Sequence, residues 1–307
     1  MLYGVLLAGG LSERFGGDKY LWRVKGRPLI SIAASAVRGV SDRVLLLVRD
    51  RERASQLLKE LSTHIDEFVI DDPSINCSGP LRGMLTALFH TEADEYLIVP
   101  GDMPWIDQES LGCFIDMCRG LNVDCGGIVW GNGALSSTIQ YLTKNARRYL
   151  EVVAEIRGIY GRATDTLRSC SRILLAHVKN VASDPKKFIG VNFKEEIINP
   201  QMPPINGAVK DNVYLKHLNP YFIDAMIAES SQKIDEALKI YRFEAEEYLS
   251  LNIYHLALHA LIDAKRCLSG EDVEIDRKIQ VCVNELKWNK AKRHIPRDPK
   301  ASRIIQH

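Results

Sequence analysis

The sequence predicts an α/β protein whose mostly parallel sheet is covered by helices on both faces, followed by a small all-helical domain. Three observations lead to this prediction. Short, almost wholly apolar runs alternate with segments of helical periodicity over residues 1–198, a pattern typical of buried parallel strands joined by helices. A stretch rich in Pro, Gly and Asn interrupts the chain at 199–212. Beyond it, apolar residues recur every three or four positions with almost no helix breakers.

The expected elements follow one another in a regular order over the first half of the chain. Strands are expected at 2–8, 43–48, 67–72, 95–100 and 123–131, and helices between them at 28–40, 51–65, 79–92 and 108–121. The pattern then loosens, with a strand at 136–142, a helix at 145–156, a loop or short helix at 160–170, a strand at 172–178 and a strand turning into a helix at 188–197. This order favours a Rossmann-like, doubly wound sheet, in which ligands bind at the carboxyl ends of strands.

Three parts of the chain are expected. A nucleotide-binding domain takes residues 1–200, a linker 201–213 and a helical domain 214–307. Within the last part, helices are expected at 235–268, as hairpins, and at 275–288, and the residues from about Lys290 are expected to fray. We expect the helical domain to stabilise the fold, to mediate self-association or to bind a protein partner.

Composition excludes several classes of protein. The net charge of +1 and the lack of a basic stripe argue against a nucleic-acid or membrane-surface binder. The seven cysteines are scattered and form no Cys-x-x-Cys pair, which favours free thiols in a reducing cytosol over disulfides or zinc sites. The apolar N-terminus has no basic segment before it and reads as a first strand rather than a signal peptide. We therefore expect a cytoplasmic protein without a membrane span.

A glycine-rich loop, "LLAGGLSERFGGDK", directly follows the first expected strand. It is neither a Walker A motif nor a G-x-G-x-x-G fingerprint. Gly9 and Gly10 nevertheless let the backbone approach a ligand, and successive N–H groups can then hold phosphate oxygens. Arg14 and Lys19 can neutralise a triphosphate, one as a planar fork and the other as a point charge. We therefore expect a nucleotide-binding loop with catalytic Arg14 and Lys19.

Two more segments with acidic residues follow buried strands. "DDPSINCSGPLRG" carries Asp71 and Asp72 after the third expected strand, and "VPGDMP" carries Asp102 after the fourth. An acid at a strand end beside a phosphate loop suits Mg²⁺, which prefers few carboxylates together with water and phosphate oxygens. A simple turn or helix cap is the alternative role for each acid.

Together, the strings "LLAGGLSERFGGDKYL", "KGRPLI", "GPLRG" and "DMP" resemble the molybdenum cofactor guanylyltransferases (the MobA type) of the nucleotidyltransferase superfamily. The resemblance covers residues 1 to about 110 well and residues up to about 198 loosely. It implies that GTP binds through a set of loop and strand-end residues, in which a carboxylate accepts hydrogen bonds from guanine. These are Leu7, Ala8, Gly9, Gly10, Lys19, Asp71, Asp72, Gly79, Pro80, Leu81 and Gly83.

The resemblance also implies the metal site and the reaction. Mg²⁺ is expected on Asp102, with Asn192 of "GVNFKEEI" approaching the metal or the acceptor phosphate, or simply completing a turn. GMP would pass from GTP to a phosphorylated acceptor such as molybdopterin, with release of pyrophosphate. The family's acceptor segment "R-x-x-P-L" is replaced here by "WGNGALSSTIQYL".

Alternatives remain open on the acceptor side. Arg162 and Arg168 could bind an acceptor phosphate or could belong to a solvated face. The donor could be CTP and the acceptor another phosphorylated molecule. A third reading is a non-catalytic nucleotide-binding scaffold with a helical interaction module, which the metal-side Asp102 argues against.

Overall fold

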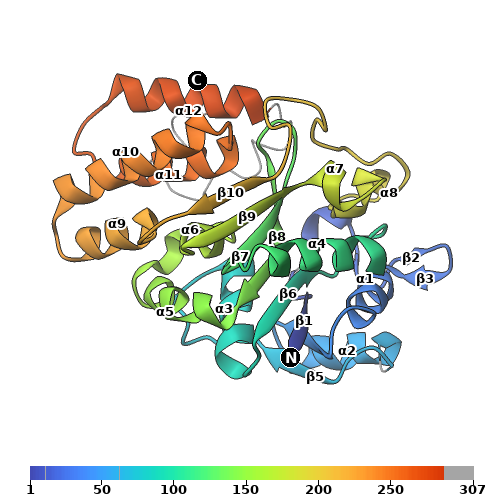
Figure 1. Cartoon of the computed structure of the whole chain (residues 1–307). Coiled ribbons are helices and arrows are strands. Elements are labelled where there is room, and N and C mark those ends of the chain that lie inside the picture. Colours follow the sequence, from blue (N-terminus) through green and yellow to red (C-terminus); the bar gives the residue numbers. More distant parts are fainter. Residues whose placement is uncertain (11, 62, 287–307) are drawn as a thin grey trace.

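The computed structural model describes residues 1–10, 12–61 and 63–286, and within them an eight-stranded sheet forms the centre of the molecule (Figure 1). Its strand order is β10-β9-β7-β8-β6-β1-β4-β5. Strand β1 pairs in parallel with β4 and β6, β4 with β5, and β7 with β9. Strand β8 is antiparallel to β6 and β7, and β10 to β9. The predicted Rossmann-like, mostly parallel α/β sheet is confirmed.

The elements begin and end as follows. The strands of the sheet are β1 (Leu2–Leu7), β4 (Arg43–Val48), β5 (Glu67–Ile70), β6 (Glu95–Pro100), β7 (Cys125–Val129), β8 (Leu135–Thr143), β9 (Arg172–His177) and β10 (Val213–Lys216). A separate hairpin contains β2 (Arg23–Val24) and β3 (Arg27–Pro28). The α-helices are α1 (Leu29–Arg38), α2 (Arg51–Leu61), α3 (Gly79–His90), α4 (Gln108–Gly120), α5 (Arg147–Ile156), α6 (Asp165–Arg168), α7 (Val178–Val181), α8 (Glu195–Ile198), α9 (Tyr221–Ser230), α10 (Ile234–Ser250), α11 (Tyr254–Arg266) and α12 (Val273–Leu286). Short 3-10 helices are η1 (Glu13–Phe15), η2 (Lys144–Ala146), η3 (Gly158–Tyr160) and η4 (Pro185–Phe188).

Helices cover both faces of the sheet, and the strands are apolar on both faces for that reason. In β1, Val5 and Leu7 point to one face and Leu2 and Leu6 to the other, since successive side chains alternate along a strand. The first face packs against α3, α5 and α6, and the second against α1, α2, α4 and α7. This two-sided burial explains the continuous apolar runs in the sequence.

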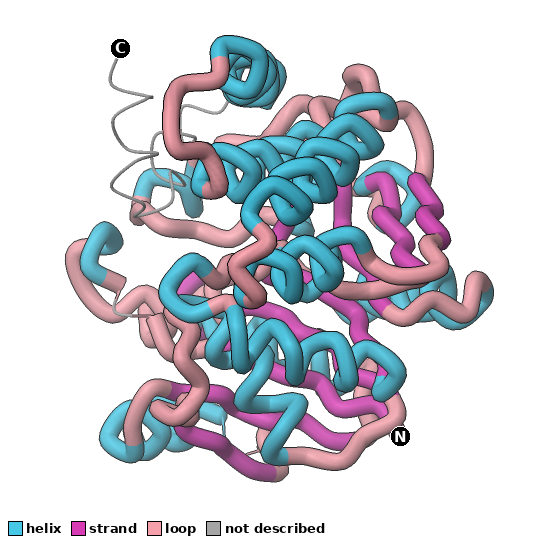
Figure 2. The backbone as a smooth tube through the Cα atoms, turned by 90° about the vertical axis from the view of Figure 1, so that its left-hand side faces the viewer, coloured by secondary structure: helices cyan, strands magenta, loops and turns pink. Residues whose placement is uncertain are grey.

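The C-terminal helices α9–α12 pack against the same side of the sheet as α5 and α6 (Figures 1 and 2). Asn252, with φ of +59°, lies in the turn between α10 and α11, so the periodic run 235–268 forms a helix hairpin. The predicted helical character of this region is confirmed for the described residues. The end of the expected helix at 275–288 and the frayed tail lie outside them.

Two local predictions differ from the structure. The strand expected at the start of 188–197 does not form: η4 ends at Phe188, and the backbone N–H of Val191 donates to the carbonyl of Asp102 (3.0 Å) instead of entering a strand ladder. Strand β10 was not expected. It pairs antiparallel with β9 at the edge of the sheet, and it spans the predicted junction between linker and helical domain, a division that stays a prediction.

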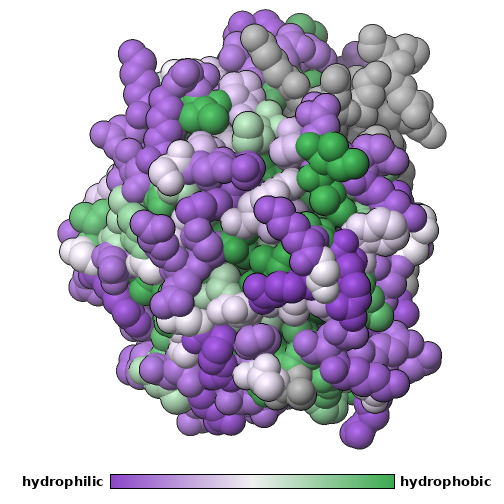
Figure 3. Space-filling model, turned by 90° about the vertical axis from the view of Figure 1, so that its right-hand side faces the viewer, coloured by the Kyte–Doolittle hydropathy of each residue, from purple (hydrophilic) through white to green (hydrophobic). Residues whose placement is uncertain are grey.

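Hydrophilic side chains cover most of the face that lies on the right of Figure 1, and hydrophobic ones gather in small areas between them (Figure 3). Among the described residues, no helix combines the length and apolar character needed to cross a bilayer. All seven cysteines are free thiols; Cys113 and Cys267 are half-buried and the others are buried.

Candidate active site

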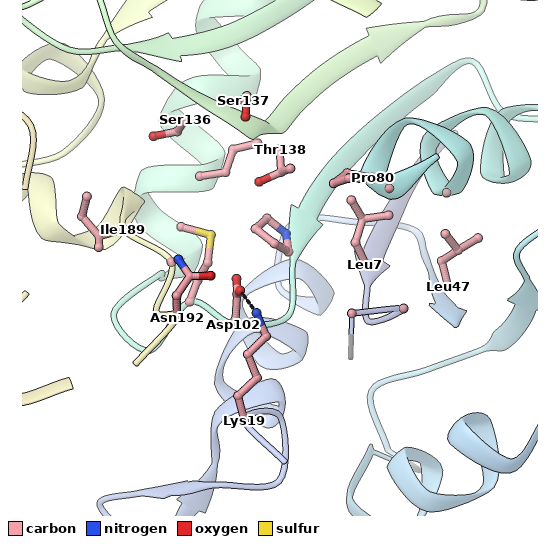
Figure 4. A pocket seen from close by; sticks show the side chains of 18 of the residues that line it. Leu7, Lys19, Leu47, Pro80, Asp102, Ser136, Ser137, Thr138, Ile189 and Asn192 are labelled. Carbon is pink, nitrogen blue, oxygen red and sulfur yellow. Dashed lines mark hydrogen bonds and ion pairs between the residues drawn. The ribbon is translucent and has the colours of Figure 1, made fainter. Parts of the chain in front are cut away.

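A cavity of about 490 Å³ lies at the carboxyl ends of β1, β5 and β6 (Figure 4). The loop after β1, the first turn of α3, the beginning of β8 and the segment 188–192 complete its lining. This volume lies within the range of small-molecule sites. Its position at the strand ends is the one that the predicted sheet topology favours for a ligand.

The glycine loop first extends the β-sheet by one residue. Its backbone then passes close to the side chains of Asp71 and Tyr20. The N–H of Ala8 donates to the carbonyl of Leu47 (2.8 Å), which extends the parallel ladder by one residue. A Cβ on Gly9 would lie 3.2 Å from Oδ2 of Asp71, and one on Gly10 3.1 Å from the Tyr20 hydroxyl. The two glycines are therefore needed for close approach within the site, in addition to leaving their N–H groups near the cavity.

Lys19 and Asp102 form an ion pair across the cavity (Figure 4). Their side chains are only 11% and 15% exposed, so little water screens the pair. Lys19 is held by its neighbours: Asp18 binds the guanidinium of Arg53, with 2.7 Å between Oδ1 and Nη2, and accepts from the N–H of Tyr20 (3.0 Å). The far half of the loop is thereby fixed to α2, and a cation and an anion face each other at the site.

Asp71 lies directly after β5, and its backbone N–H donates to the carbonyl of Val48 (2.8 Å). Its Oδ1 is buried and has no hydrogen-bond partner among the described residues. Burial raises the pKa of this carboxyl to about 6, against the opposing charge of Arg82. A carboxylate that lines a cavity with unused acceptor capacity is a strong candidate for ligand binding.

Segment 188–192 brings further groups beside Asp102. A Cβ on Gly190 would lie 3.0 Å from Oδ1 of Asp102, so glycine permits this close approach. Asn192 lines the cavity, and its backbone N–H donates to Glu196 (2.7 Å). Across the described residues, no three His, Cys, Asp or Glu side chains converge on a metal site. One carboxylate and one amide oxygen beside a phosphate-sized space fit Mg²⁺, which takes its remaining ligands from water and phosphate.

The sequence model of the MobA-like NTP transferase domain family matches residues 4–178, a range that contains the glycine loop, Asp71 and Asp102. The chain belongs to this family. MobA-like domains transfer nucleotides, and the chain is accordingly a nucleotidyltransferase. Helices α9–α12 lie beyond the matched range.

Individual relatives agree with the family match. A protein of Pyrococcus furiosus named as a probable molybdenum cofactor guanylyltransferase is 30% identical over 205 residues, 64% of this chain and 95% of that protein. A Thermococcus kodakarensis protein of the same name is 29% identical over 198 residues, 64% of this chain and 92% of that protein. The crystal structure of molybdopterin-guanine dinucleotide biosynthesis protein A from Archaeoglobus fulgidus covers 64% of this chain and 95% of its own, with a TM-score of 0.52 and 18% identity, and shows the shared fold.

The MobA-like site contains most, but not all, of the residues expected from the sequence. Those that line the cavity are Leu7, Gly9, Gly10, Lys19, Asp71, Gly79, Pro80, Gly83, Asp102 and Asn192. Ala8 and Leu81 are instead fully buried among apolar side chains. Asp72 points elsewhere: its pKa is lowered to about 2 by hydrogen bonds from Ser74 and from His90. Arg14 is exposed on η1 and does not line the cavity.

The structure adds lining residues that the sequence did not indicate. The beginning of β8, Leu135–Ile139, forms the side of the cavity opposite the glycine loop, and we call it the β8 wall. Trp130 lies against it and donates from Nε1 to the hydroxyl of Ser136 (3.0 Å). Arg82 lines the cavity from α3. A serine-rich strand end carries no sequence signal of its own; only the sheet order, which places β8 beside β6, brings it to the site.

Arg162 and Arg168 do not reach the cavity, so their expected role in binding an acceptor phosphate is wrong. The alternative of a solvated face is wrong as well, because their side chains are 10% and 0% exposed. Both donate to Asp263 of α11, at 3.0 and 2.7 Å. We call this group of seven side chains the buried ion cluster; it contains Arg157, Arg162, Asp165, Arg168, Glu244, Asp263 and Arg266.

The buried ion cluster connects the matched family domain to the C-terminal helices. Arg168 donates to Glu244 of α10 (2.7 Å between Nη2 and Oε2), and Arg157 donates to both oxygens of Asp263. Burial alone would raise the pKa of Asp263, but the charges of Arg157, Arg162 and Arg168 outweigh it and hold that pKa well below its usual value. Asp263 is therefore ionised, and the cluster joins helices to one another, since its side chains pair among themselves outside the cavity lining.

Proposed function

We propose that this nucleotidyltransferase transfers GMP from GTP to the phosphate of a small acceptor such as molybdopterin and releases pyrophosphate. The observation that carries the choice of guanine is the carboxylate of Asp71, which lines the cavity with a buried oxygen that lacks a partner among the described residues. Guanine presents two adjacent N–H donors, at N1 and N2, and an ionised carboxylate can accept both. Cytosine has no such pair of donors. The names of the relatives from Pyrococcus and Thermococcus support the same choice.

The phosphates of GTP are proposed to lie along Gly9 and Gly10; the N–H of Gly9 suits a phosphate oxygen, and that of Gly10, which donates to the Tyr20 hydroxyl, would have to exchange this partner for phosphate. Lys19, at the cavity edge, would neutralise part of the triphosphate charge. Asp102 and Asn192 would hold Mg²⁺, which when bound would withdraw negative charge from the reacting phosphates. The ammonium of Lys19 balances the carboxylate of Asp102, and binding of the triphosphate and Mg²⁺ would separate these two charges.

The reaction itself needs little acid–base chemistry from the protein. An oxygen of the acceptor phosphate forms a bond to the α-phosphorus of GTP, and the bond from that phosphorus to the oxygen bridging to the β-phosphate breaks. Pyrophosphate leaves with the electron pair. Because an acceptor phosphate is already ionised, no residue has to remove a proton. The cavity would contribute by orienting the two substrates and by neutralising their charge.

The test uses the full chain with Mg²⁺ and the four ribonucleoside triphosphates. Thermal shifts should rank GTP first, and pyrophosphate should appear from GTP only when molybdopterin is added. Preferential stabilisation by CTP would overturn the guanine assignment. Binding of GTP without pyrophosphate release in the presence of molybdopterin would overturn the proposed acceptor and favour a nucleotide-binding scaffold or another phosphorylated acceptor.

A further inference from the structure

The two sides of the cavity differ in charge. Four charged side chains line it, and all of them come from the glycine loop, β5, α3 and β6; they are Lys19, Asp71, Arg82 and Asp102. The β8 wall and the facing segment 188–192 contribute apolar, hydroxyl and amide side chains only. The first side carries two cations and two carboxylates, and all of these groups except Arg82 are proposed above to bind GTP or Mg²⁺. The second side is left for the other substrate.

Within the β8 wall, hydroxyl groups remain available to a ligand. Ser136 is fully used, because its Oγ accepts from Trp130 and donates to the carbonyl of Phe188 (3.1 Å). The hydroxyls of Ser137 and Thr138 have no hydrogen bond to another described residue, and both residues are half-buried. Thr138 extends from β8 toward the middle of the cavity (Figure 4). Each hydroxyl can both donate and accept.

Besides its pairing with β7 and the bonds of Ser136, the beginning of the β8 wall is held by the C-terminal helices. The backbone N–H of Leu135 donates to Nδ1 of His255 (3.1 Å), and the N–H of His255 donates to the carbonyl of Gly133 (3.2 Å). The amide of Asn132 donates to the carbonyl of Leu286 at the end of α12 (2.8 Å). In Figure 1 the turn between β7 and β8 reaches up to the end of α12.

The turn between β7 and β8 also packs closely against the residues that precede α11. Gly133 has φ of +72°, and a Cβ there would lie 2.1 Å from the carbonyl oxygen of Asn252. The residues that hold the turn, from Asn252 to Leu286, all lie beyond the range matched by the MobA-like family model. This chain therefore uses a segment outside the family domain to fix one side of the family's cavity.

We propose that the β8 wall is the acceptor side of the active site and that the C-terminal helices, through His255, hold it in place. His255 is a positioning residue, and Thr138 contacts the acceptor. The proposal rests on the proposed guanylyl transfer. Because the wall offers hydroxyl and apolar groups but no charge, the part of the acceptor that lies on it is expected to be uncharged and to carry hydrogen-bonding groups.

The decisive experiment compares two substitutions of His255 in the full chain. His255→Leu removes the acceptor for the Leu135 amide, and His255→Asn keeps an oxygen at a position similar to Nδ1. Without substrate, hydrogen exchange of residues 130–139 should rise at least about tenfold in His255→Leu, remain near wild type in His255→Asn, and stay unchanged at residues 5–10 in both. Equal exchange at 130–139 in wild type and His255→Leu would overturn the holding role.

Kinetics then test the link to the acceptor. With molybdopterin as the probe, His255→Leu should raise the KM for molybdopterin at least about fivefold and leave the Kd for GTP unchanged. A parallel loss of GTP affinity would show a general effect on folding and would overturn the proposal. If the wild-type protein binds GTP but transfers nothing to molybdopterin, the proposed function and the acceptor role of the wall both fail, while hydrogen exchange still decides the holding role.

A second pair of variants tests the wall directly. Thr138→Val keeps the shape of the side chain and removes its hydroxyl, so the KM for molybdopterin should rise about 3- to 10-fold. Thr138→Ser keeps the hydroxyl and should stay within about twofold of wild type. An unchanged KM in Thr138→Val would exclude Thr138 as an acceptor contact. Neither variant should alter hydrogen exchange at 130–139 or the Kd for GTP.

Discussion

The cavity and the buried ion cluster contain the same kinds of side chain but use them differently. In the cluster, Asp263 is fully buried and receives hydrogen bonds from Arg157, Arg162 and Arg168. In the cavity, Asp71 keeps a buried oxygen without a partner among the described residues. One carboxylate has its charge fully compensated by the protein, and the other leaves acceptor capacity for something that the protein does not supply.

This difference separates structural from functional charge. A buried charge must be compensated, and when the protein itself provides the compensation the group contributes to the fold. When compensation is incomplete, folding bears a cost that a ligand can offset. Compensation of the carboxylate charge therefore distinguishes the two regions, whereas unpaired buried hydrogen-bonding atoms do not, because Arg157 and Arg162 of the buried ion cluster also carry such atoms. The comparison can be tested by substituting one residue at a time on each side.

The largest effect on activity is expected from Asp102→Ala. The variant loses the carboxylate proposed to hold Mg²⁺ and the partner of Lys19, so GMP transfer should fall by about 10²- to 10³-fold or more. Because Lys19 lines the cavity, water that enters there can solvate its ammonium once the carboxylate is gone, so the free energy of unfolding should change by less than about 2 kcal/mol. Pyrophosphate release and urea unfolding measure the two quantities. Turnover near the wild-type level would contradict the assigned role.

Asp263→Asn is expected to lower stability strongly and to leave GTP binding unchanged, the reverse of Asp102→Ala. Four arginines lose a shared negative charge, so the free energy of unfolding should fall by about 3–5 kcal/mol. The folded protein should still bind GTP normally. Asp94→Asn provides the matched control, because Asp94 pairs with Lys144 on an exposed part of the surface and should change stability by less than about 1 kcal/mol. An equally small effect of Asp263→Asn would remove the distinction drawn between the two regions.

The sequence predicted the two acids of the charged side because each lies one or two residues beyond the end of a strand, whereas Arg82, inside α3, was not predicted. Asp71 and Asp102 come after β5 and β6, and Gly9 after β1, so the parallel arrangement alone brings them to one edge of the sheet. Asp72 was expected at the same site, but both acids lie beyond the end of β5, and Asp72 forms hydrogen bonds with Ser74 and His90 instead of lining the cavity.

The rest of the site could not be predicted, because it depends on contacts between distant segments. Arg168 meets Glu244 and Asp263, which lie 76 and 95 residues away, and the local string "RATDTLR" is the same whether its arginines face water or a helix. The β8 wall is likewise recognisable only once the order of the strands and the position of α11 are known. Local patterns identified the strand ends, whereas the packing of the C-terminal helices decided what surrounds them.

An intermediate effect on activity is expected from Asp71→Asn. This variant tests whether the carboxylate of Asp71, which the protein leaves only partly compensated, binds the guanine base. The amide can accept only one of the two proposed hydrogen bonds from guanine, so the affinity for GTP should fall by about 10- to 100-fold. The loss should be larger for GTP than for ATP, and equilibrium binding of the four nucleotides measures it. The same reduction for every nucleotide would show that Asp71 does not read the base.

The same substitution should also change how stability depends on pH. The folded-state pKa of Asp71 is about 6, above the value of about 3.9 expected in the unfolded chain. Wild-type protein should therefore lose stability relative to Asp71→Asn as the pH rises from about 4 to 6, by about 1–2 kcal/mol because the group is partly exposed to the cavity. Below about pH 4 the free energy of unfolding should change with pH to the same extent in both proteins, because Asp71 is then protonated in the folded and the unfolded state. Urea unfolding of both proteins across this range provides the measurement.

The smallest effect is expected from Arg14→Ala. Arg14 lies exposed on η1, away from the cavity lining, whereas Lys19 is 9% exposed and lines the cavity. An exposed cation attracts a triphosphate only through screened charge, so the KM for GTP should rise by about two- to fivefold at low ionic strength, and the difference should largely disappear at about 0.5 M salt. Lys19→Ala is the matched comparison, and its larger defect should persist in salt. A salt-resistant defect in Arg14→Ala as large as that of Lys19→Ala would show that η1 moves onto the phosphates when GTP binds, because only direct contact in a low-dielectric site resists screening.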